Sequence, residues 1–483
     1  MDTAAPSAVF MAPDDAVDVA VDQLRETQPL FAAVPTFTAR QLLTVLLVTV
    51  ALLLSASLAL RATAILIMSI AQLFYLFNTF DRMILIVRGL RAGARISITD
   101  AEARAIPEDE LPVYTVLLPA FHEPEIVREL VAGVGQLEYP PDKLDIKLLL
   151  EADDELTVNA ARHATGVDVI LVPPREPRTK PKACNVGLQF ARGSLLTIYD
   201  AEDVPEPLQL RRAVAAFAAV DDDVVCLQGK LGYFNERQNL LTLWFSTEYD
   251  QWFGYMLPAF AASGAPLPLG GTSNHIRTDV LVELGGWDPA NVTEDADLGI
   301  RLARRGYRTC VLDSHTSEEA NSDPVNWVRQ RSRWYKGYLQ TFLVHSRQPL
   351  RTARELGPAG FLRFVTFTLG TPASAVVNLG MWLLALLWLL GARTPIAALF
   401  PTPTYFVALI SLVLGNGAVI YLGILTTCEM RKPHLLLANA LVPLYWLLMS
   451  LAALKAFLQL ITNPTYWEKT VHGLAGEQES DGS

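Results

Sequence analysis

The sequence predicts an α/β domain built on a mainly parallel sheet, joined to an α-helical transmembrane region of about five membrane segments. Two observations support this prediction. Hydrophobic residues make up 51% of the 483 residues and the mean hydropathy is positive, which is unusual for a purely soluble chain. Between residues 107 and 349, short β-rich apolar runs alternate with helical stretches, a pattern typical of βαβ units.

Five runs without charged residues are long enough to cross a bilayer: 41–60, 62–80, 364–392, 405–427 and 435–454. A spanning helix needs about 20 apolar residues. One such run alone could be a buried core helix, but five together indicate membrane helices. Only Arg61 separates the first two, so we expect a tight helical hairpin over 41–82.

The later runs form a second helical region, expected over 361–461 and followed by a tail over 462–483. Five full crossings would place this tail outside the cell. Pro372 and Pro443 offer an alternative, because proline breaks a helix and can leave an interfacial or re-entrant piece in place of a crossing.

We expect residues 1–40 to be a disordered, acidic, cytosolic tail. They lack the basic start and short apolar stretch of a secretory signal, and they contain Asp14, Asp15, Asp18 and Asp22. Basic residues near helix ends mark the cytosolic side of a membrane. They flank the expected hairpin on both sides, at Arg40, Arg82, Arg88, Arg91 and Arg95. The chain is therefore predicted to be a multi-pass protein of the cell membrane whose 107–349 domain is cytosolic.

Charge and cysteine content argue against two other classes of site. A net charge of −11 disfavours nucleic acid as a partner, since phosphate backbones are bound by basic surfaces. The cysteines form no CxxC pair and have no even spacing, so neither a disulfide framework nor a zinc site is indicated; they are Cys184, Cys226, Cys310 and Cys428.

Acidic residues follow three of the expected strands, which we place at 113–118, 146–150, 167–172 and 195–199. The first is followed by PAFHE, the second by EADD and the fourth by DAED. Ligands bind at the carboxyl ends of such strands, although any single acid there could equally cap a helix. The sharpest cluster is Asp200, Glu202 and Asp203. Its carboxylates repel one another unless neutralised, and their hard oxygens suit Mg²⁺ or Mn²⁺.

A basic loop lies between the EADD and DAED segments. Arg175, Arg178, Lys180 and Lys182 fall within eight residues and precede Asn185. Such a loop could meet phosphate charge, or it could be an ordinary solvated surface.

Two further segments carry polar groups just before apolar stretches. Thr293-Glu-Asp295 opens an expected amphipathic helix, where Thr293 could simply cap the helix and the two acids complement its dipole. Gln330-Arg-Ser-Arg-Trp334 places two guanidinium groups, an amide and an indole on adjacent turns. Arginine suits a diphosphate, and the face of tryptophan suits a sugar ring.

In this order and spacing, PAFHE, EADD, KACN, DAED, TED and QRSRW resemble the membrane-integrated family 2 glycosyltransferases of GT-A fold. That branch includes the cellulose and hyaluronan synthases. The resemblance covers residues 111–336, with membrane segments on both sides. It implies a Rossmann-like GT-A domain that uses a nucleoside-diphosphate sugar, with a UDP-sugar as the first expectation and GDP-mannose as the second, together with Mg²⁺ or Mn²⁺.

The resemblance also implies roles for individual residues. The nucleotide-sugar-binding residues would be Phe121, His122, Glu123, Asp153, Lys182, Asn185 and Arg333; the metal ligands would come from Asp200, Glu202 and Asp203; Gln330 and Trp334 would bind the acceptor. Asp295 would be the general base of a single inverting displacement at the anomeric carbon.

Two departures leave assignments open. The first acidic motif is EADD where many relatives show DDG, so either Glu151 or Asp153 would contact the base of the nucleotide. The metal motif is DAED in place of DxD, so Asp203 could replace Glu202. The segment NPTYWEKTVHG at 463–473 resembles a C-terminal signature of bacterial members of this branch and has no assigned role.

The expected activity is elongation of a β-linked polysaccharide at the bilayer, with export of the product through the helices. Transfer of one sugar to a lipid acceptor is the alternative within the same class. From a different class, a transporter or receptor with a soluble regulatory domain would need ionisable residues inside the membrane runs or internal repeats, and the runs contain no charge.

Overall fold

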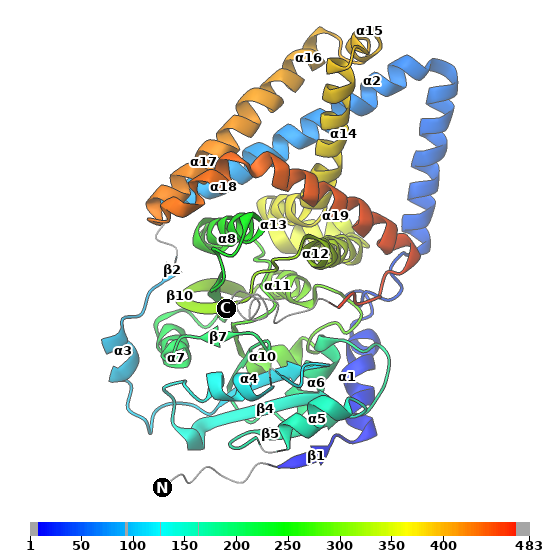
Figure 1. The fold of residues 1–483 in the computed structure, drawn as a ribbon. Coiled ribbons are helices and arrows are strands. Elements are labelled where there is room, and N and C mark those ends of the chain that lie inside the picture. The colour runs from blue at the N-terminus through cyan, green and yellow to red at the C-terminus, as the bar shows by residue number, and fades with distance from the viewer. Residues whose placement is uncertain (1–7, 92–94, 126, 163, 470–483) are drawn as a thin grey trace.

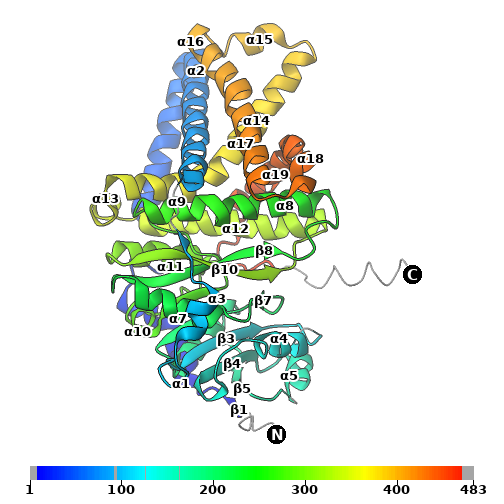
Figure 2. The ribbon, with the colours of Figure 1, turned by 90° about the vertical axis from the view of Figure 1, so that its left-hand side faces the viewer.

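The computed structural model describes residues 8–91, 95–125, 127–162 and 164–469. A sheet-containing domain forms one end of the molecule and a group of long helices forms the other (Figure 1). Viewed from the side, helices α8 and α12 lie across the junction between the two, roughly perpendicular to α2 (Figure 2).

One sheet organises the α/β domain. Its strands are β1 (Val9–Met11), β2 (Arg95–Ile96), β3 (Tyr114–Ala120), β4 (Leu144–Glu151), β5 (Asp168–Val172), β6 (Leu195–Ile198), β7 (Val204–Pro205), β8 (Val224–Tyr233), β9 (Asn274–Arg277) and β10 (Arg308–Glu318). They follow the order β1-β5-β4-β3-β6-β9-β8-β10-β2, with β7 beside β10. Pairing is parallel except where β9 meets β6 and β8 and where β7 meets β10. The prediction of a mainly parallel sheet is confirmed, and β3 to β6 match the four expected strands.

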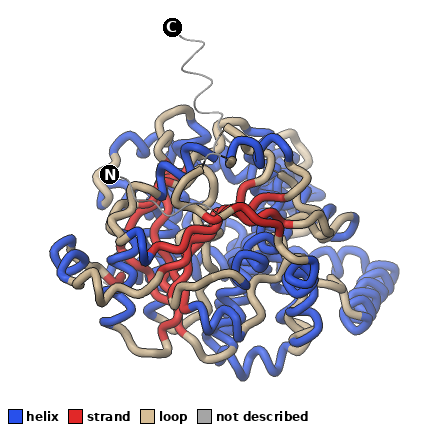
Figure 3. Tube along the Cα trace, turned by 90° about the horizontal axis from the view of Figure 1, so that it is seen from below, coloured by secondary structure: helices blue, strands red, loops and turns tan. Residues whose placement is uncertain are grey.

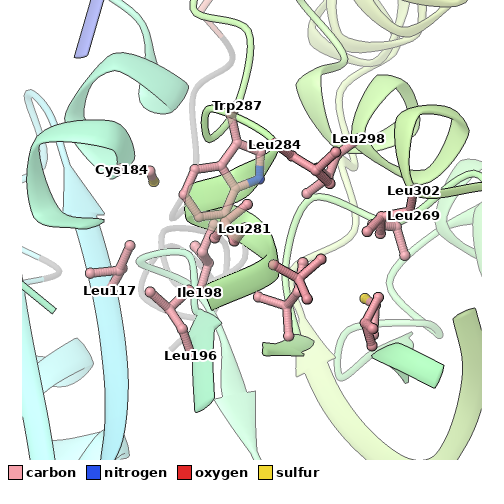
Figure 4. Close-up of a cluster of buried hydrophobic side chains, with 14 of the residues drawn as sticks. Leu117, Cys184, Leu196, Ile198, Leu269, Leu281, Leu284, Trp287, Leu298 and Leu302 are labelled. Carbon is pink, nitrogen blue, oxygen red and sulfur yellow. The ribbon is translucent and has the colours of Figure 1, made fainter. Parts of the chain in front are cut away.

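Helices cover both faces of the sheet (Figure 3). They are α1 (Asp14–Thr27), α3 (Asp100–Ala105), α4 (Val127–Val134), α5 (Glu155–Ala161), α6 (Lys180–Gln189), α7 (Gln209–Ala219), α10 (Thr278–Glu283) and α11 (Glu294–Arg304), with a 3₁₀ turn at Pro141–Lys143. Alternate residues of β3 enter different cores, because strand side chains point to opposite faces. Leu117 packs with residues of α1, α6 and α11, whereas Val116 packs with residues of α5 and α7. Figure 4 shows part of the first core, including Trp287, Leu281 and Ile198.

A layer of helices separates the α/β domain from the long apolar helices. It contains α8 (Leu240–Gln251), a π-helical turn (Trp252–Met256), α9 (Leu257–Ala262), α12 (Pro324–His345), α13 (Pro349–Val365), a 3₁₀ turn (Pro433–Leu435), α18 (Leu436–Ala440) and α19 (Val442–Thr462). A third core joins α8, α12 and α19, with Trp327 and Tyr445 among its buried aromatic residues. This layer therefore contacts both the sheet-containing domain and the apolar helices.

Four helical stretches are long and apolar enough to cross a membrane: Ala39–Arg91, Pro349–Leu389, Thr402–Glu429 and Val442–Thr462. Their elements are α2 (Ala39–Arg91), α13, a π-helical turn (Thr366–Gly370), α14 (Thr371–Leu389), α16 (Thr402–Leu409), a π-helical turn (Ile410–Gly415), α17 (Asn416–Glu429) and α19; the short α15 (Arg393–Ala397) follows α14. The expected hairpin corresponds to α2, whose two arms meet at a non-helical Ala59 (Figure 1). The five predicted apolar runs thus correspond to four candidate spans, because α2 contains the first two runs.

The N-terminal segment differs from the expectation. Residues 8–40 do not form a disordered tail: β1 pairs in parallel with β5, and α1 buries Ala16, Val17, Ala20 and Leu24. The acids that suggested disorder lie on the solvent side of an amphipathic helix whose small apolar face packs on the domain. Residues 1–7 lie outside the described part of the chain.

Candidate active site

A cavity of about 520 Å³ lies where the strand ends face the helical layer. Strands β4, β3 and β6 are neighbours in the sheet, so the segments that follow them come together at one edge. The cavity wall includes side chains from all three segments, from α11 and α12, and from the apolar helices. The predicted convergence of the acidic strand ends is therefore present.

The DAED segment contributes two carboxylates to this wall, Asp200 and Glu202. Asp203 is turned inward instead: its Oδ2 accepts hydrogen bonds from the Asp200 amide (2.6 Å) and from the Thr272 hydroxyl. Its Oδ1 is buried with no hydrogen-bond partner among the described residues. Burial, with the nearby charges of Asp200 and Glu202, raises the pKa of Asp203 well above its usual range.

Lys180 is the lysine of the basic loop that meets these acids. Its Nζ pairs with Asp200 and donates to the Gly271 carbonyl at 2.7 Å. Burial opposes its charge, but the carboxylates of Asp200 and Glu294 outweigh that effect and raise its pKa. The sequence placed Lys180 in the loop without choosing it as a site residue, because the signal is its phase on a helix whose start at Lys180 the sequence did not define.

Lys182 and Asn185, which were expected near the diphosphate, face away from the cavity wall. The Nζ of Lys182 is buried between Glu151 Oε1 (2.7 Å) and the Arg175 carbonyl (2.9 Å). The Asn185 amide donates to the carbonyls of Ala20 and Trp287 and accepts from the Trp287 amide. Residues two apart on a helix point in nearly opposite directions, so only one of Lys180 and Lys182 can reach the site.

At the other end of the sheet edge, Glu151 lines the cavity and keeps its Oε2 without a hydrogen-bond partner among the described groups. Asp153 is instead paired with Arg178 at 2.7 Å. Of the PAFHE segment, every residue except His122 is in the wall, including the predicted Phe121 and Glu123. His122 is exposed, has a positive φ of 55°, and its amide donates to Asp154 Oδ2.

The TED segment forms the start of α11. Thr293 holds the N-cap position, but its side chain makes no capping hydrogen bond, and a Cβ on Gly337 of α12 would lie 2.3 Å from its Oγ1. Glu294 and Asp295 both line the cavity. Burial raises the pKa of Asp295 to about 6, and burial together with the Asp295 charge raises that of Glu294 to about 8. A carboxyl group with a pKa near neutrality is suited to proton transfer.

Helix α12 brings Gln330, Arg333 and Trp334 to the same wall. Gln330 accepts a hydrogen bond from Asn321 at 3.0 Å, and Trp334 stands near the Arg331 guanidinium, which lies 4.6 Å from the centre of its ring. Arg331 itself forms two hydrogen bonds to Glu248, at 2.8 and 2.6 Å. All three predicted residues of this motif therefore reach the cavity, and Arg331 supports the ring of Trp334.

Two elements of the wall carried no predicted role. The C-terminal segment 463–469 lies on α12, where Lys336 donates to the Tyr466 carbonyl at 2.6 Å, and Trp467 lies 4.6 Å from the Arg333 guanidinium. Lys469 donates to the Phe121 carbonyl. Glu318, at the end of β10, also lines the cavity. The strand-end rule that selected Asp200 would have selected Glu318 had β10 been predicted.

The acids of the wall fit a metal site in part. Among the described residues, no group of three or more His, Cys, Asp or Glu side chains is arranged to hold an ion. However, Asp200 and Glu202 present hard oxygen ligands to the cavity, and their charge raises the pKa of Asp203. Asp200 and Glu202 are the residues that would hold a divalent cation, while Asp203 supports the loop that carries them.

A mainly parallel sheet with acidic strand ends, an acid-bearing α11 and a QRSRW helix, attached to apolar helices, defines a membrane-type GT-A domain. The chain belongs to the glycosyl transferase family group 2: that family model matches residues 195–466. The model for glycosyl transferase family 2 matches residues 115–265. The family prediction is confirmed.

Several curated proteins are similar. "Probable glycosyltransferase YdaM" of Bacillus subtilis is 29% identical over 238 residues, covering 47% of this chain and 56% of that protein. Glucomannan 4-beta-mannosyltransferase 2 of Arabidopsis thaliana is 27% identical over 242 residues, covering 48% and 45%. Beta-monoglucosyldiacylglycerol synthase of Trichormus variabilis is 25% identical over 243 residues, covering 49% and 51%. The chain thus spans about half the length of the curated relatives it matches.

Among solved structures, the mannosyltransferase PcManGT from Pyrobaculum calidifontis, in complex with GDP-Man and Mn²⁺, aligns with 20% identity and a TM-score of 0.47. The alignment covers 78% of this chain and 99% of that one.

Proposed function

We propose that the protein is an inverting, metal-dependent glycosyltransferase that elongates a β-linked polysaccharide from a nucleoside-diphosphate sugar and passes the product into its apolar helices. The observation that supports this best is the cavity in which Asp295, Lys180 and Arg333 share a wall with polar side chains of the membrane helices. A UDP-sugar is the first candidate donor and GDP-mannose the second.

The nucleoside would lie at the β3–β4 end of the cavity. Phe121 supplies an aromatic wall there, and Glu151 offers an unpaired carboxylate oxygen to the N–H of a base. This supports Glu151 over Asp153 for base contact, since Asp153 is already paired with Arg178. His122 would act through its strained backbone, which positions Phe121 and Glu123.

The diphosphate would lie between Lys180 and Arg333, whose positive charges face the acids from two different helices. Preorganised charge at a leaving group usually makes the greatest single contribution to catalysis. Asp200 and Glu202 would hold Mg²⁺ or Mn²⁺, which would supply further charge neutralisation of the diphosphate.

Asp295 would accept the proton of the acceptor hydroxyl. As that oxygen bonds to the anomeric carbon, the bond from this carbon to the diphosphate oxygen breaks, and the nucleoside diphosphate leaves with inversion. Trp334, held by Arg331, would stack on the acceptor sugar, and Gln330 would orient it.

The product path is supported by the upper part of the cavity wall. Asn378, Asn416 and Trp446 of the apolar helices line the cavity there. Trp382 and Trp388 are exposed on the outside of α14, as interfacial anchors would be. Transfer to a lipid acceptor is the second candidate, because the Trichormus variabilis relative is named as a synthase of a glucosyldiacylglycerol.

The orientation we propose places the α/β domain in the cytosol and makes the number of crossings even. Gln41, at the start of α2, donates to the Leu343 carbonyl of α12, and Lys469, after α19, reaches Phe121. Both ends of the helical region therefore lie on the domain's side. The two arms of α2, α14 and α16–α17 supply four crossings, and α19 packs across α12 at the base of the helical region (Figure 1).

The test is to incubate the purified protein, in detergent and in lipid, with a panel of radiolabelled nucleotide sugars and Mg²⁺ or Mn²⁺, and to size the product. A ladder or high-mass material is expected. A monoglycosylated lipid alone would replace elongation by the lipid-acceptor reaction. Absence of transfer from any donor would contradict the proposal as a whole.

A further inference from the structure

The N-terminal segment before α2 packs on the back of the elements that form the cavity. Helix α1 lies beside α6 (Figure 1), and Val17 and Ala20 share a core with Cys184. Gln189 donates to the Ala16 carbonyl at 2.7 Å. This segment therefore contacts the helix that begins with Lys180, from the side opposite to the site.

Two acids of α1 hold one arginine of the basic loop. Asp18 and Asp22 are one helical turn apart, so they share a face. Arg175 forms an ion pair with Asp18 through one terminal nitrogen and with Asp22 through the other, the latter at 2.6 Å. The guanidinium is thus fixed by two carboxylates on a rigid helix. These are the charges that made the segment resemble a disordered tail in the sequence.

The loop held in this way leads directly to the nucleoside end of the cavity. The Arg175 carbonyl accepts a hydrogen bond from Lys182 Nζ, and the same Nζ pairs with Glu151 Oε1. Lys182 is buried and Glu151 is 6% exposed, so this ion pair has little freedom to move. Three residues after Arg175, Arg178 lines the cavity and pairs with Asp153.

We propose that α1 positions the nucleoside-binding carboxylate: Asp18 and Asp22, acting through Arg175 and Lys182, orient Glu151 so that its free oxygen meets the base. This inference rests on the proposed function, since it assigns the nucleoside to that end of the cavity. Asp18, Asp22 and Arg175 do not line the cavity, so they are positioning residues.

A purely structural role for the ion pairs predicts that their loss lowers the melting temperature and leaves nucleotide affinity unchanged. Asp18 and Arg175 are partly exposed, and exposed ion pairs contribute little to stability. On the positioning proposal, their loss should therefore leave the melting temperature unchanged. A positioning role instead changes nucleotide affinity, while turnover at saturating donor stays the same because Asp295, Lys180 and Arg333 are unaffected.

The experiment measures UDP and GDP binding by calorimetry on the full-length protein in detergent. The variants are Asp18→Asn/Asp22→Asn, Arg175→Ala and the triple combination. Asp14→Asn/Asp15→Asn is the matched control, since it removes the same charge from exposed residues in the first turn of the same helix. Melting temperature is measured for each, as is turnover at saturating donor with the nucleotide sugar that the donor panel identifies.

We expect the Asp18/Asp22 variant and Arg175→Ala each to weaken nucleotide binding by about threefold to tenfold, a coupling typical of residues in one network. The triple variant should be no weaker than Arg175→Ala, because the acids act through that arginine. The control should bind as the wild type does.

Equal binding by the wild type and the Asp18/Asp22 variant would overturn the inference and leave the proposed function intact. Additive losses in the triple variant would overturn it too, as would a loss of turnover at saturating donor with unchanged binding. A wild-type protein that binds neither UDP nor GDP would contradict the proposed function itself.

Discussion

The two ends of the cavity differ in the kind of polar group they present. The end at the sheet edge is charged, with Asp200, Asp295 and Glu294 facing Lys180 and Arg333. The end among the apolar helices presents mainly amides and an indole, from Asn78, Asn378, Asn416 and Trp446, while Asp81 of the same wall is paired with Arg363. Charge is suited to a diphosphate and to proton transfer, whereas amides and an indole suit hydroxyl groups and sugar rings. The proposed function therefore assigns the reaction to the charged end, called the reacting end, and passage of the product to the neutral end, called the conducting end.

Removing a charge from the reacting end should have the largest effect. Asp200→Asn is expected to reduce transfer by about a thousandfold or more, because the diphosphate site loses both a carboxylate and the partner of Lys180. Excess EDTA should have the same effect on the wild type and be reversed by Mn²⁺. Circular dichroism and melting temperature report whether the variant is folded. Full wild-type activity in EDTA would remove the metal from the proposal.

Asp295→Asn should lower turnover by about a hundredfold to ten-thousandfold, the range of a lost general base. Nucleotide binding should remain, since the proposed partner of Asp295 is the acceptor. Calorimetry with UDP or GDP and a turnover assay on the same preparation measure the two effects. If turnover stayed near that of the wild type, the base role would pass to the neighbouring Glu294.

The pH profile sharpens the same assignment. A base works when deprotonated, and burial raises the pKa of Asp295 to about 6, so turnover should rise with pH through about 6 and then level off. At pH 5 it should be about tenfold below the plateau, since one pKa unit changes the ionised fraction about tenfold. A midpoint of about 4, the ordinary range of an exposed carboxylate, would contradict a buried carboxyl group as the base.

Substitutions at the conducting end should have the smallest effect on rate and a specific effect on the length of the product. Trp446→Leu removes an indole from the cavity wall, and Trp388→Leu removes one from the exposed face of α14. We expect the first to shorten the product by about twofold to tenfold through lost sugar stacking and the second to leave it unchanged. Gel sizing at equal donor consumption measures this. Equal products from both variants would assign Trp446 to helix packing.

The sequence was most informative where one physical cause dominates. Short, mainly apolar runs marked β3 to β6, because strands buried on both faces are rich in apolar residues, and acids after three of them marked the site. It was least informative for elements whose structure depends on packing against residues distant in the sequence. The apolar face of α1 is built mainly from alanine and valine, so the aspartates of this helix obscured it until the partner surface on α6 was known. The choice of Lys180 over Lys182 depended on helix phase, which no spacing rule supplies without the start of α6.

The position of the C-terminal segment has a consequence for how the enzyme is made. Asp295 leaves the ribosome roughly 170 residues before Lys469, which at about 5–20 residues per second is an interval on the order of ten seconds or more. During that interval the sheet and its acids can fold, but Trp467 and Lys469 have not yet joined the cavity wall. The membrane helices must insert before these residues reach α12. A chain whose synthesis has not yet reached residues 463–469 therefore holds an unfinished cavity wall.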